Sequence, residues 1–287
     1  MNKFRLNMER RHILEGYVFV LPFIIGFAIF FAFPLFISIK LSLGKLTKIV
    51  GFEIAWTGFE NFKRAFLVDV AFIPMFLQVV MQTLLQAPLI IIFSLMLAIL
   101  INKSFRFRGF FRTVFFIPFL LGSGDVMRQL LYQGVDKSLI SIADGGLISR
   151  ELLLYLGNTA VTGVDAFFGI IVVVLWSSGV QILLLLSGLQ NIQSSLYESA
   201  RIDGATEWEM FWKITLPMMT PILVLVIIYT FVDSFTGVVN PILEYIRLLA
   251  FDNMDFTYAA AIGWIYFIFI FLVVMTVFSL FKKSMKP

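Results

Sequence analysis

The chain contains no cysteine and a single histidine among its 287 residues. Without thiols it has no disulfide bond, no thiolate metal ligand and no cysteine nucleophile. His12 has no second histidine with which to form the His-Glu-x-x-His pattern of a zinc peptidase. The phosphate-binding pattern Gly-x-x-x-x-Gly-Lys-Ser/Thr is absent as well. We therefore expect no metal site and no catalytic site in this chain.

Charged residues are scarce: they make up 14% of the chain, against 60% hydrophobic residues. A soluble domain of this composition would expose large apolar patches to water. The formal net charge of +4 comes from basic residues that lie beside apolar runs and form no stripe, so we expect no nucleic-acid partner. The composition is typical of an integral membrane protein that contacts lipid.

Six apolar runs are long enough to cross a hydrocarbon core of about 30 Å, which takes about 20 helical residues. They lie near residues 16–42, 73–102, 112–134, 164–190, 216–237 and 257–281. The first run is too long to be the apolar part of a cleaved signal peptide, so we interpret it as a retained span. No internal repeat is visible. The sequence predicts an all-α integral membrane protein with one six-helix domain over residues 1–287.

Lys and Arg near the span ends predict the orientation, because cytoplasmic loops carry the excess of these residues. They gather in three segments, at Lys3, Arg5, Arg10, Arg11, Lys103, Arg106, Arg108, Arg112, Lys282, Lys283 and Lys286. Six spans put these segments on one side, so both termini are expected in the cytoplasm. The same parity puts the loop at about 191–217 inside, although its charges are largely acidic. This exception indicates a role beyond setting the orientation.

The inner loop is unusually rich in charge for a link between two spans. The run from Glu198 to Asp203 fits a short helix, Gly204 fits a turn with positive φ, and Pro217 fits the start or a kink of the next span. One interpretation is an amphipathic helix on the inner membrane surface. The other, favoured by the spacing, is a short exposed helix that docks onto another protein.

The same loop resembles the EAA loop of ATP-binding-cassette importer permeases, which reads Glu-Ala-Ala, then Gly six residues after the Glu, then Ile-x-Leu-Pro. The matching residues are Glu198, Ala200, Asp203, Gly204, Ala205, Ile214, Leu216 and Pro217, with Ser199 where the family usually has Ala. The run from Leu189 to Thr206 is most similar to the carbohydrate-uptake branch, of which the maltose-type permeases are best known. The segment Trp56–Lys63 resembles a shorter motif that precedes the second span of sugar permeases.

The resemblance implies a permease subunit of the bacterial cytoplasmic membrane that translocates a sugar or oligosaccharide. A short cytoplasmic coupling helix would join the fourth and fifth spans, with Glu198 meeting a basic residue of an ATPase. The implied partners are a second, homologous permease chain, two ATPase subunits that bind ATP and Mg²⁺, and an extracellular or periplasmic solute-binding protein. This chain itself would be no enzyme and would hold no cofactor.

A stand-alone secondary transporter driven by an ion gradient is the competing hypothesis. Such carriers are built from repeats and usually need a carboxylate near the middle of the membrane. Asp125 and Asp233 are the candidates, both expected near the outer surface, and no repeat is visible. The sequence therefore favours the importer.

Polar side chains inside the spans mark a candidate substrate path, because each is costly in lipid and tends to face the bundle interior or a wet cavity. Gln78, Gln82 and Gln86 recur every four residues and form a stripe on one helix face. This stripe fits either hydrogen bonds between helices or a surface along a sugar path.

The other candidates for the path lie in the third, fourth and fifth spans: Asp125, Gln129, Trp176, Gln181, Asp233 and Asn240. Asp125 can pair with Arg128 on a helix, which leaves a structural ion pair, an outer vestibule and a polar pocket open. Trp176 and Gln181 suit the faces and hydroxyls of sugars but suit packing equally well. Asn240 stands in Val-Val-Asn-Pro, where the family often carries Gly-Gly-Pro.

Overall fold

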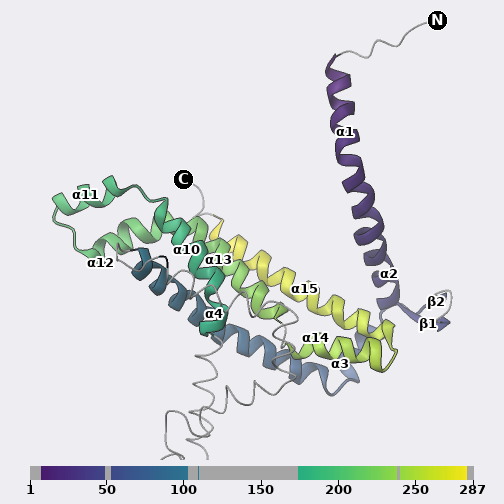
Figure 1. Ribbon diagram of the computed structural model, residues 1–287. Coiled ribbons are helices and arrows are strands. Elements are labelled where there is room, and N and C mark those ends of the chain that lie inside the picture. Colours follow the sequence, from purple (N-terminus) through teal and green to yellow (C-terminus); the bar gives the residue numbers. More distant parts are fainter. Residues whose placement is uncertain (1–7, 49–52, 103–108, 110–173, 238–239, 283–287) are drawn as a thin grey trace, which may run out of the picture. The chain divides into compact units, whose positions relative to one another are not determined.

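The computed structural model describes residues 8–48, 53–102, 109, 174–237 and 240–282. The described chain is mostly helical (Figure 1). It divides into two compact units, the first made of Met1–Met75 and Ile242–Ile268 and the second of Phe76–Pro241 and Phe269–Pro287. The predicted third span, at 112–134, and the first part of the predicted fourth lie outside the described residues. That the chain has six spans therefore stays a prediction.

The first unit starts with one long helix, formed by α1 (Met8–Phe27), the π-helical turn η1 (Ala28–Ala32) and α2 (Phe33–Ser42). Its residues Glu15–Ser42 are long and apolar enough to cross a membrane. Pro34 is the second residue of α2, which follows η1 directly. Because proline lacks an N–H and its ring clashes with the carbonyl four residues earlier, the helix adapts by widening just before it.

A short antiparallel hairpin, β1 (Gly44–Lys48) and β2 (Glu53–Trp56), follows α2. The all-α prediction did not include this hairpin, although the rest of the described chain is helical or irregular. Gly44 lies opposite Trp56, and a Cβ atom at Gly44 would lie 2.3 Å from Ile54 Cγ2, so this position has no room for a side chain. Both strands are too short, and their alternation of polar and apolar residues is too irregular, for the hairpin to be recognised from the sequence.

The first unit is completed by α3 (Glu60–Leu67), α14 (Pro241–Arg247), the π-helical turn η4 (Leu248–Asp252) and the beginnings of α4 (Phe72–Asn102) and α15 (Phe256–Phe281). Its buried apolar side chains include Ala65, Phe72, Ile242, Tyr258 and Ile262. These come from both sequence segments of the unit, so segments that are nearly 200 residues apart in the chain form one structure.

The second unit holds the rest of α4 and α15, together with α10 (Gly179–Gln190), α11 (Ser194–Ile202), α12 (Glu207–Met210), the π-helical turn η3 (Phe211–Thr215) and α13 (Leu216–Thr236). Its apolar core comes from α4, α10 and α13: Ala98, Ile101, Ile182, Leu185, Leu186, Leu189, Met219 and Val226. Helices α10 and α13 pack closely at Gly188, where a Cβ atom would lie 3.1 Å from Ile222 Cγ1.

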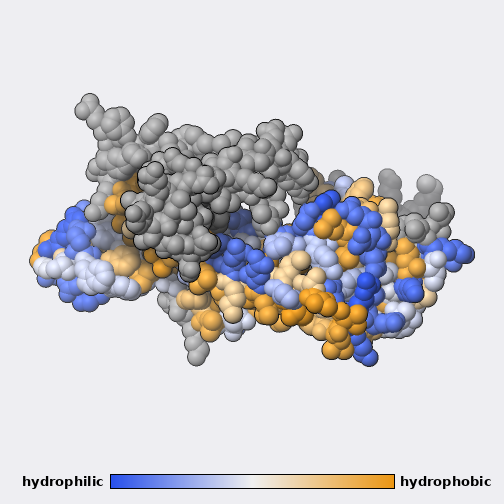
Figure 2. All heavy atoms as spheres, turned by 90° about the horizontal axis from the view of Figure 1, so that it is seen from below, coloured by the Kyte–Doolittle hydropathy of each residue, from blue (hydrophilic) through white to orange (hydrophobic). Residues whose placement is uncertain are grey.

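Four helical stretches among the described residues are long and apolar enough to cross a membrane: Glu15–Ser42, Phe72–Asn102, Glu207–Thr236 and Phe256–Phe281. They coincide with four of the predicted spans, and the third of them starts nine residues before the predicted 216. No more than 28% of each apolar window is buried within the chain. Figure 2 shows hydrophobic residues exposed on one face between hydrophilic groups. Such a surface fits lipid or other membrane subunits rather than water.

Candidate functional site

The charged loop near residues 191–217 forms a helical hairpin. Helix α11 contains no buried residue. It ends in a turn at Gly204, whose φ of +81° is the left-handed conformation that glycine adopts without strain. Backbone N–H groups of Asp203 and Ala205 donate to the carbonyls of Ser199 and Ala200, at 3.0 and 2.9 Å, and close this turn. The short helix and the glycine turn agree with the local structure that the sequence predicts.

The second arm of this hairpin starts with a capping box. Thr206 Oγ1 accepts from the Glu209 N–H at 3.3 Å, and the Thr206 N–H donates to Glu209 Oε2 at 3.0 Å. From there α12, η3 and α13 run on as one helix to Thr236. Pro217 is the second residue of α13, which follows the π-helical turn directly, so it widens a continuing helix instead of starting one.

Two contacts join α11 to this second arm. The hydroxyls of Tyr197 and Thr215 lie 2.8 Å apart, and Arg201 pairs with Glu207 at 3.2 Å. The ion pair is exposed on both sides and contributes little to stability. The half-buried hydroxyl pair is the firmer link, and it places the middle of α11 beside the residue that precedes α13.

One face of α11 carries an exposed carboxylate and an exposed aliphatic side chain. Glu198 and Ile202 are four residues apart and so share a helix face. Glu198 is exposed and forms no ion pair with the described residues, and the side chain of Ile202 is 87% exposed. Ala200 is half-buried beside them, and Ser199 and Asp203 are exposed. A carboxylate next to an exposed aliphatic side chain offers a second protein both charge and apolar area.

The three glutamines of the predicted stripe lie on α4. Gln78 and Gln82 are exposed and Gln86 is half-buried, and none of them hydrogen-bonds another described residue. Each directly precedes a residue of the buried stripe formed by Val79, Thr83 and Ala87, so the glutamines occupy the adjacent helix face. The structure thus places a polar stripe at the edge of the packed face.

Gln181 is fully buried. Its Nε2 donates to Thr230 Oγ1 at 3.4 Å, which joins α10 to α13. Its Oε1 atom is buried without a hydrogen-bond partner among the described residues, as are Trp176 Nε1 and Ser94 Oγ. Unpaired buried polar atoms are uncommon and call for a reason. The place of Trp176 and Gln181 on a substrate path stays a prediction.

Asp233 and Asn240 lie at the end of the fifth predicted span. Asp233 is half-buried in the last turn of α13. Asn240 is buried, and its Nδ2 donates to the carbonyl of Phe235 at 2.7 Å. This bond satisfies one of the carbonyls that a helix end leaves open. Asp125 and Gln129, like Arg128, lie outside the described residues, so the structure does not bear on them.

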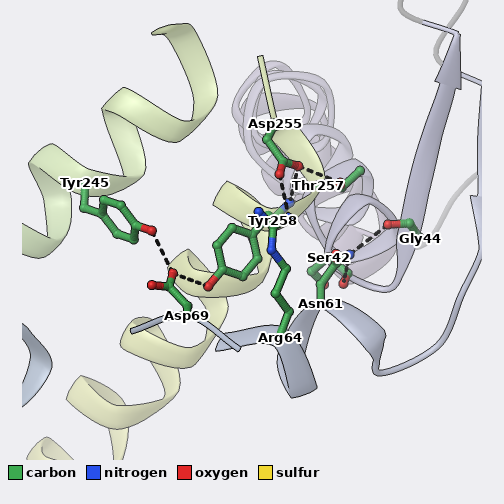
Figure 3. Close-up of polar contacts among 9 residues, drawn as sticks. All are labelled: Ser42, Gly44, Asn61, Arg64, Asp69, Tyr245, Asp255, Thr257 and Tyr258. Carbon is green, nitrogen blue, oxygen red and sulfur yellow. Dashed lines mark hydrogen bonds and ion pairs between the residues drawn. The ribbon is translucent and has the colours of Figure 1, made fainter. Parts of the chain in front are cut away.

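A second polar cluster, in the first unit, was not predicted (Figure 3). Its centre is Asp69, which accepts hydrogen bonds from the phenols of Tyr245, at 2.7 Å, and Tyr258. The same carboxylate accepts from the backbone N–H groups of Ala71, at 2.8 Å, and Phe72, at 3.2 Å, and so caps the start of α4. Asp69 thereby fastens the segment before α4 to α14 and α15.

Arg64 and Asp255 form the other half of this cluster. Arg64 Nη1 lies 2.8 Å from Asp255 Oδ2, and the guanidinium carbon lies 3.9 Å from the ring centroid of Tyr258. Asp255 also accepts from the backbone N–H of Tyr258, at 3.2 Å, and so caps α15. Figure 3 shows Arg64, Tyr245 and Tyr258, from α3, α14 and α15, close to the carboxylates of Asp69 and Asp255, which precede α4 and α15. We call Arg64, Asp69, Tyr245, Asp255 and Tyr258 the outer cluster, after the side of the membrane on which the predicted orientation puts them.

Hydrogen bonding tunes the electrostatics of the outer cluster. Burial alone would raise the pKa of Asp69, but the bonds from Tyr258, Tyr245, Ala71 and Phe72 outweigh it and hold that pKa below its ordinary value. Burial, together with the bond to Asp69, raises the pKa of Tyr245 to about 12. The cluster therefore holds an ionised carboxylate between neutral phenols at neutral pH.

Asn61 completes this region by joining the hairpin to α3. Its Nδ2 donates to the carbonyls of Ser42, at 3.1 Å, and Gly44, at 2.9 Å. Gly58, with φ of +67°, makes the turn that leads into α3. Both residues belong to the Trp56–Lys63 segment that the sequence analysis singled out, and the structure gives them a physical role.

Comparison with known proteins finds membrane components of transport systems. A family model described as binding-protein-dependent transport system inner membrane component matches residues 68–287. Over 292 residues the chain is 28% identical to the probable ABC transporter permease protein YesP of Bacillus subtilis, covering 94% of this chain and 91% of that protein. It is 29% identical to the lactose transport system permease protein LacF of Rhizobium radiobacter, covering 91% and 92%.

Two further comparisons extend this pattern. The trehalose/maltose transport system permease protein MalF of Thermococcus litoralis is 28% identical, over 81% of this chain and 77% of that protein. Among solved structures, a chain of a bacterial alginate ABC transporter in complex with an alginate pentasaccharide-bound periplasmic protein superposes with a TM-score of 0.67. It is 19% identical and covers 99% of both chains, so it is similar in fold.

Proposed function

Because the chain belongs to the family of binding-protein-dependent transport system inner membrane components, we propose that it is the permease subunit of an ATP-driven importer for a sugar or oligosaccharide. The observation that carries the proposal is the family match over residues 68–287, which includes the exposed helix α11 with its EAA-type sequence. Several of the permeases to which the chain is similar are named for carbohydrates, among them lactose, arabinooligosaccharides, and trehalose and maltose. Carbohydrate is the substrate class that they share.

In this proposal α11 is the coupling helix. It enters a groove of an ATPase subunit, where Glu198 meets a basic residue and Ile202 fills an apolar depression. Two ATPase subunits bind ATP and Mg²⁺ and carry out hydrolysis, which this chain cannot do without a P-loop. When ATP closes the ATPase pair, α11 moves with it. The Tyr197–Thr215 contact and the unbroken helix from Glu207 to Thr236 carry that movement through the membrane.

The stripe Gln78, Gln82 and Gln86 lines the substrate path. Amide groups exposed on a membrane-spanning helix are costly against lipid. The stripe therefore faces a second, homologous permease chain, and the two chains enclose a polar path between them. Amides both donate and accept hydrogen bonds, as sugar hydroxyls require. Among the other candidates, Asp125, Gln129, Trp176, Gln181, Asp233 and Asn240 stay assigned to the path or its mouth.

The last part of the proposal is the location of the importer and the orientation of this chain in the membrane. The importer lies in the bacterial cytoplasmic membrane with the termini and α11 inside, and a periplasmic or extracellular binding protein delivers the substrate from the other side. The outer cluster then lies on the delivery side. An ion-gradient carrier is not favoured, because the relatives with which the chain aligns almost end to end are permeases of transport systems, one of them named as an ABC transporter.

The test is purification of a tagged chain from its own membranes in mild detergent, with identification of the proteins that accompany it. The expected result is an ATPase and a second permease in stable association. After reconstitution with the binding protein, the complex takes up a radiolabelled oligosaccharide only when ATP is enclosed on the ATPase side. Recovery of this chain alone, with uptake driven by an ion gradient and unaffected by ATP, would overturn the proposal.

A further inference from the structure

The helix that carries the fifth span is longer than a membrane requires. It runs over 30 residues, Glu207–Thr236, which at about 1.5 Å per residue is about 45 Å. The hydrocarbon core takes up about 30 Å of this length, so about ten residues lie outside it. The charged residues of this helix near its start are Glu207, Glu209 and Lys213, so most of the surplus length lies at the inner end.

That surplus carries an aromatic cluster, formed by the exposed Trp208 and Trp212 and the half-buried Phe211. The side chain of Trp208 is 70% exposed and that of Trp212 is 49% exposed. The two indole rings meet edge to face with centroids 5.5 Å apart, and the ring of Phe211 lies 5.2 Å from that of Trp212. Two exposed tryptophans in contact are unusual for a surface that faces only water.

We propose that Trp208, Phe211 and Trp212 lie in the lipid headgroup layer of the inner leaflet and fix the height of α11 relative to the membrane. Three observations favour lipid as the occupant. The cluster is continuous with a membrane-spanning helix, it lies at the depth that the helix length gives for the headgroup layer, and Trp is enriched at that layer because its ring is amphipathic. Lys213 follows directly and pairs with Glu209 at 3.6 Å, so its charge also lies at this level.

An anchored aromatic cluster would also fix the position of α11. Thr215, which contacts Tyr197 of α11 at 2.8 Å, lies three residues after Trp212. A cluster held in the headgroups therefore keeps the docking face of α11, with Glu198 and Ile202, at a constant distance from the bilayer. The inference rests on the proposed function only for the cytoplasmic position of this loop.

The test uses the absence of native cysteine. Single variants Trp208→Cys and Trp212→Cys are compared with Ile202→Cys, and Leu225→Cys serves as the control within the span, since Leu225 is exposed on α13. Inside-out vesicles that hold the whole importer are treated with a charged, membrane-impermeant maleimide, before and after the ATPase subunits are removed with urea. Because this chain has no cysteine of its own, label on its gel band reports only the introduced position.

Positions 208 and 212 are expected to react about tenfold more slowly than position 202 in stripped vesicles, because headgroups restrict the charged reagent. Removal of the ATPase should not change them. If their labelling rises on stripping, as expected for position 202, the ATPase covers them and the proposal is wrong. Rapid labelling before and after stripping means exposure to water and also overturns it.

A second measurement separates lipid from the second permease chain. A photoreactive p-benzoylphenylalanine in place of Trp212 should crosslink to phospholipid and add the mass of one lipid. A crosslink to a protein chain would contradict the proposal. None of these outcomes affects the permease assignment, which the labelling of position 202 and the uptake assay test separately.

Discussion

The outer cluster and the face of α11 that carries Glu198 differ in whether the chain itself provides partners for their charges. In the outer cluster the chain provides the partners itself: Asp69 has two phenols and two backbone N–H groups, and Arg64 has Asp255. On α11, Glu198 is exposed without an ion-pair partner among the described residues. A charge that the chain satisfies by itself stabilises the fold, whereas an exposed charge on a short rigid helix is available to another protein. Substitutions on α11 should therefore lower uptake, and substitutions in the outer cluster should lower the stability of the chain.

The largest effect is expected from Glu198→Arg. The proposed docking sets Glu198 against a basic residue of an ATPase, so a second positive charge there should lower ATP-driven uptake by about 30-fold or more, the range for breaking an interfacial charge pair. The unfolding temperature of the chain should stay unchanged, because the side chain is exposed. Uptake by the reconstituted importer and thermal unfolding in detergent measure the two quantities.

The matched control for this change is Glu60→Arg, an equal charge reversal at an exposed residue of α3. It should leave ATP-driven uptake within about twofold of the unmodified chain, as surface substitutions usually do. Normal uptake by the Glu198 variant would remove the docking assignment, whatever the control does.

Asp69→Ala should have the opposite profile. It leaves two phenols and two backbone N–H groups without their acceptor, and hydrogen bonds to a charged group contribute about 1.5 to 3 kcal/mol each, so we expect a loss of about 3 kcal/mol in the free energy of unfolding. Denaturant unfolding of the purified chain measures it. Asp252→Ala, at an exposed residue of the same unit, should change stability by less than about 0.5 kcal/mol. Equal stability of the two variants would show that the outer cluster is not structural.

The pH dependence of stability should also separate the two regions. The pKa of Asp69 lies below its ordinary value of 3.8 in the folded chain. Its contribution is therefore present above pH 3.8 and is lost as the pH falls through the lowered value. An unfolding curve taken at decreasing pH should show this acid loss in the unmodified chain and a smaller one in Asp69→Asn. An identical acid loss in both chains would mean that Asp69 does not titrate as described.

The smallest effect is expected at Met254, which precedes Asp255 and has a φ of +55°. A non-glycine residue in this conformation is strained by about 1 kcal/mol. Because Met254 is also exposed, Met254→Gly should stabilise the chain by up to about 1 kcal/mol without changing uptake. Met254→Ala keeps the strain and should give no gain. Destabilisation by the glycine would show that the methionine side chain makes a necessary contact.

Long-range structure could not be predicted to the same extent as the spans. The helices at 72–102 and 256–281 coincide with predicted spans within one residue, because uninterrupted apolar runs mark them. The hydrogen bond from Tyr258 to Asp69 joins residues 189 positions apart, and no local pattern indicates such a pair. Asp69 and Asp255 did carry one local signal, since each stands shortly before an apolar helix, where a capping carboxylate is favoured.

The candidate functional residues also divide into those that local spacing predicts and those whose surroundings depend on packing. The turn at Gly204 and the helix around Glu198 follow from local spacing, and both are present. Gln181 is a path candidate because its side chain is polar, but its burial and its bond to Thr230 depend on how α10 and α13 pack, which local spacing does not indicate. Polarity within a span therefore indicates a candidate, and packing decides which side of the helix it faces.

The most direct measurement is crosslinking from a single cysteine at Glu198. With no native cysteine in the chain, a thiol-to-amine crosslinker on Glu198→Cys in the purified importer should join this chain to an ATPase subunit. The same reagent on Asp252→Cys should join it to none. Peptide mapping should place the bond in one groove of the ATPase, and the yield should change when ATP is added. A Glu198→Cys chain that forms no adduct with the ATPase in an active importer would contradict the account.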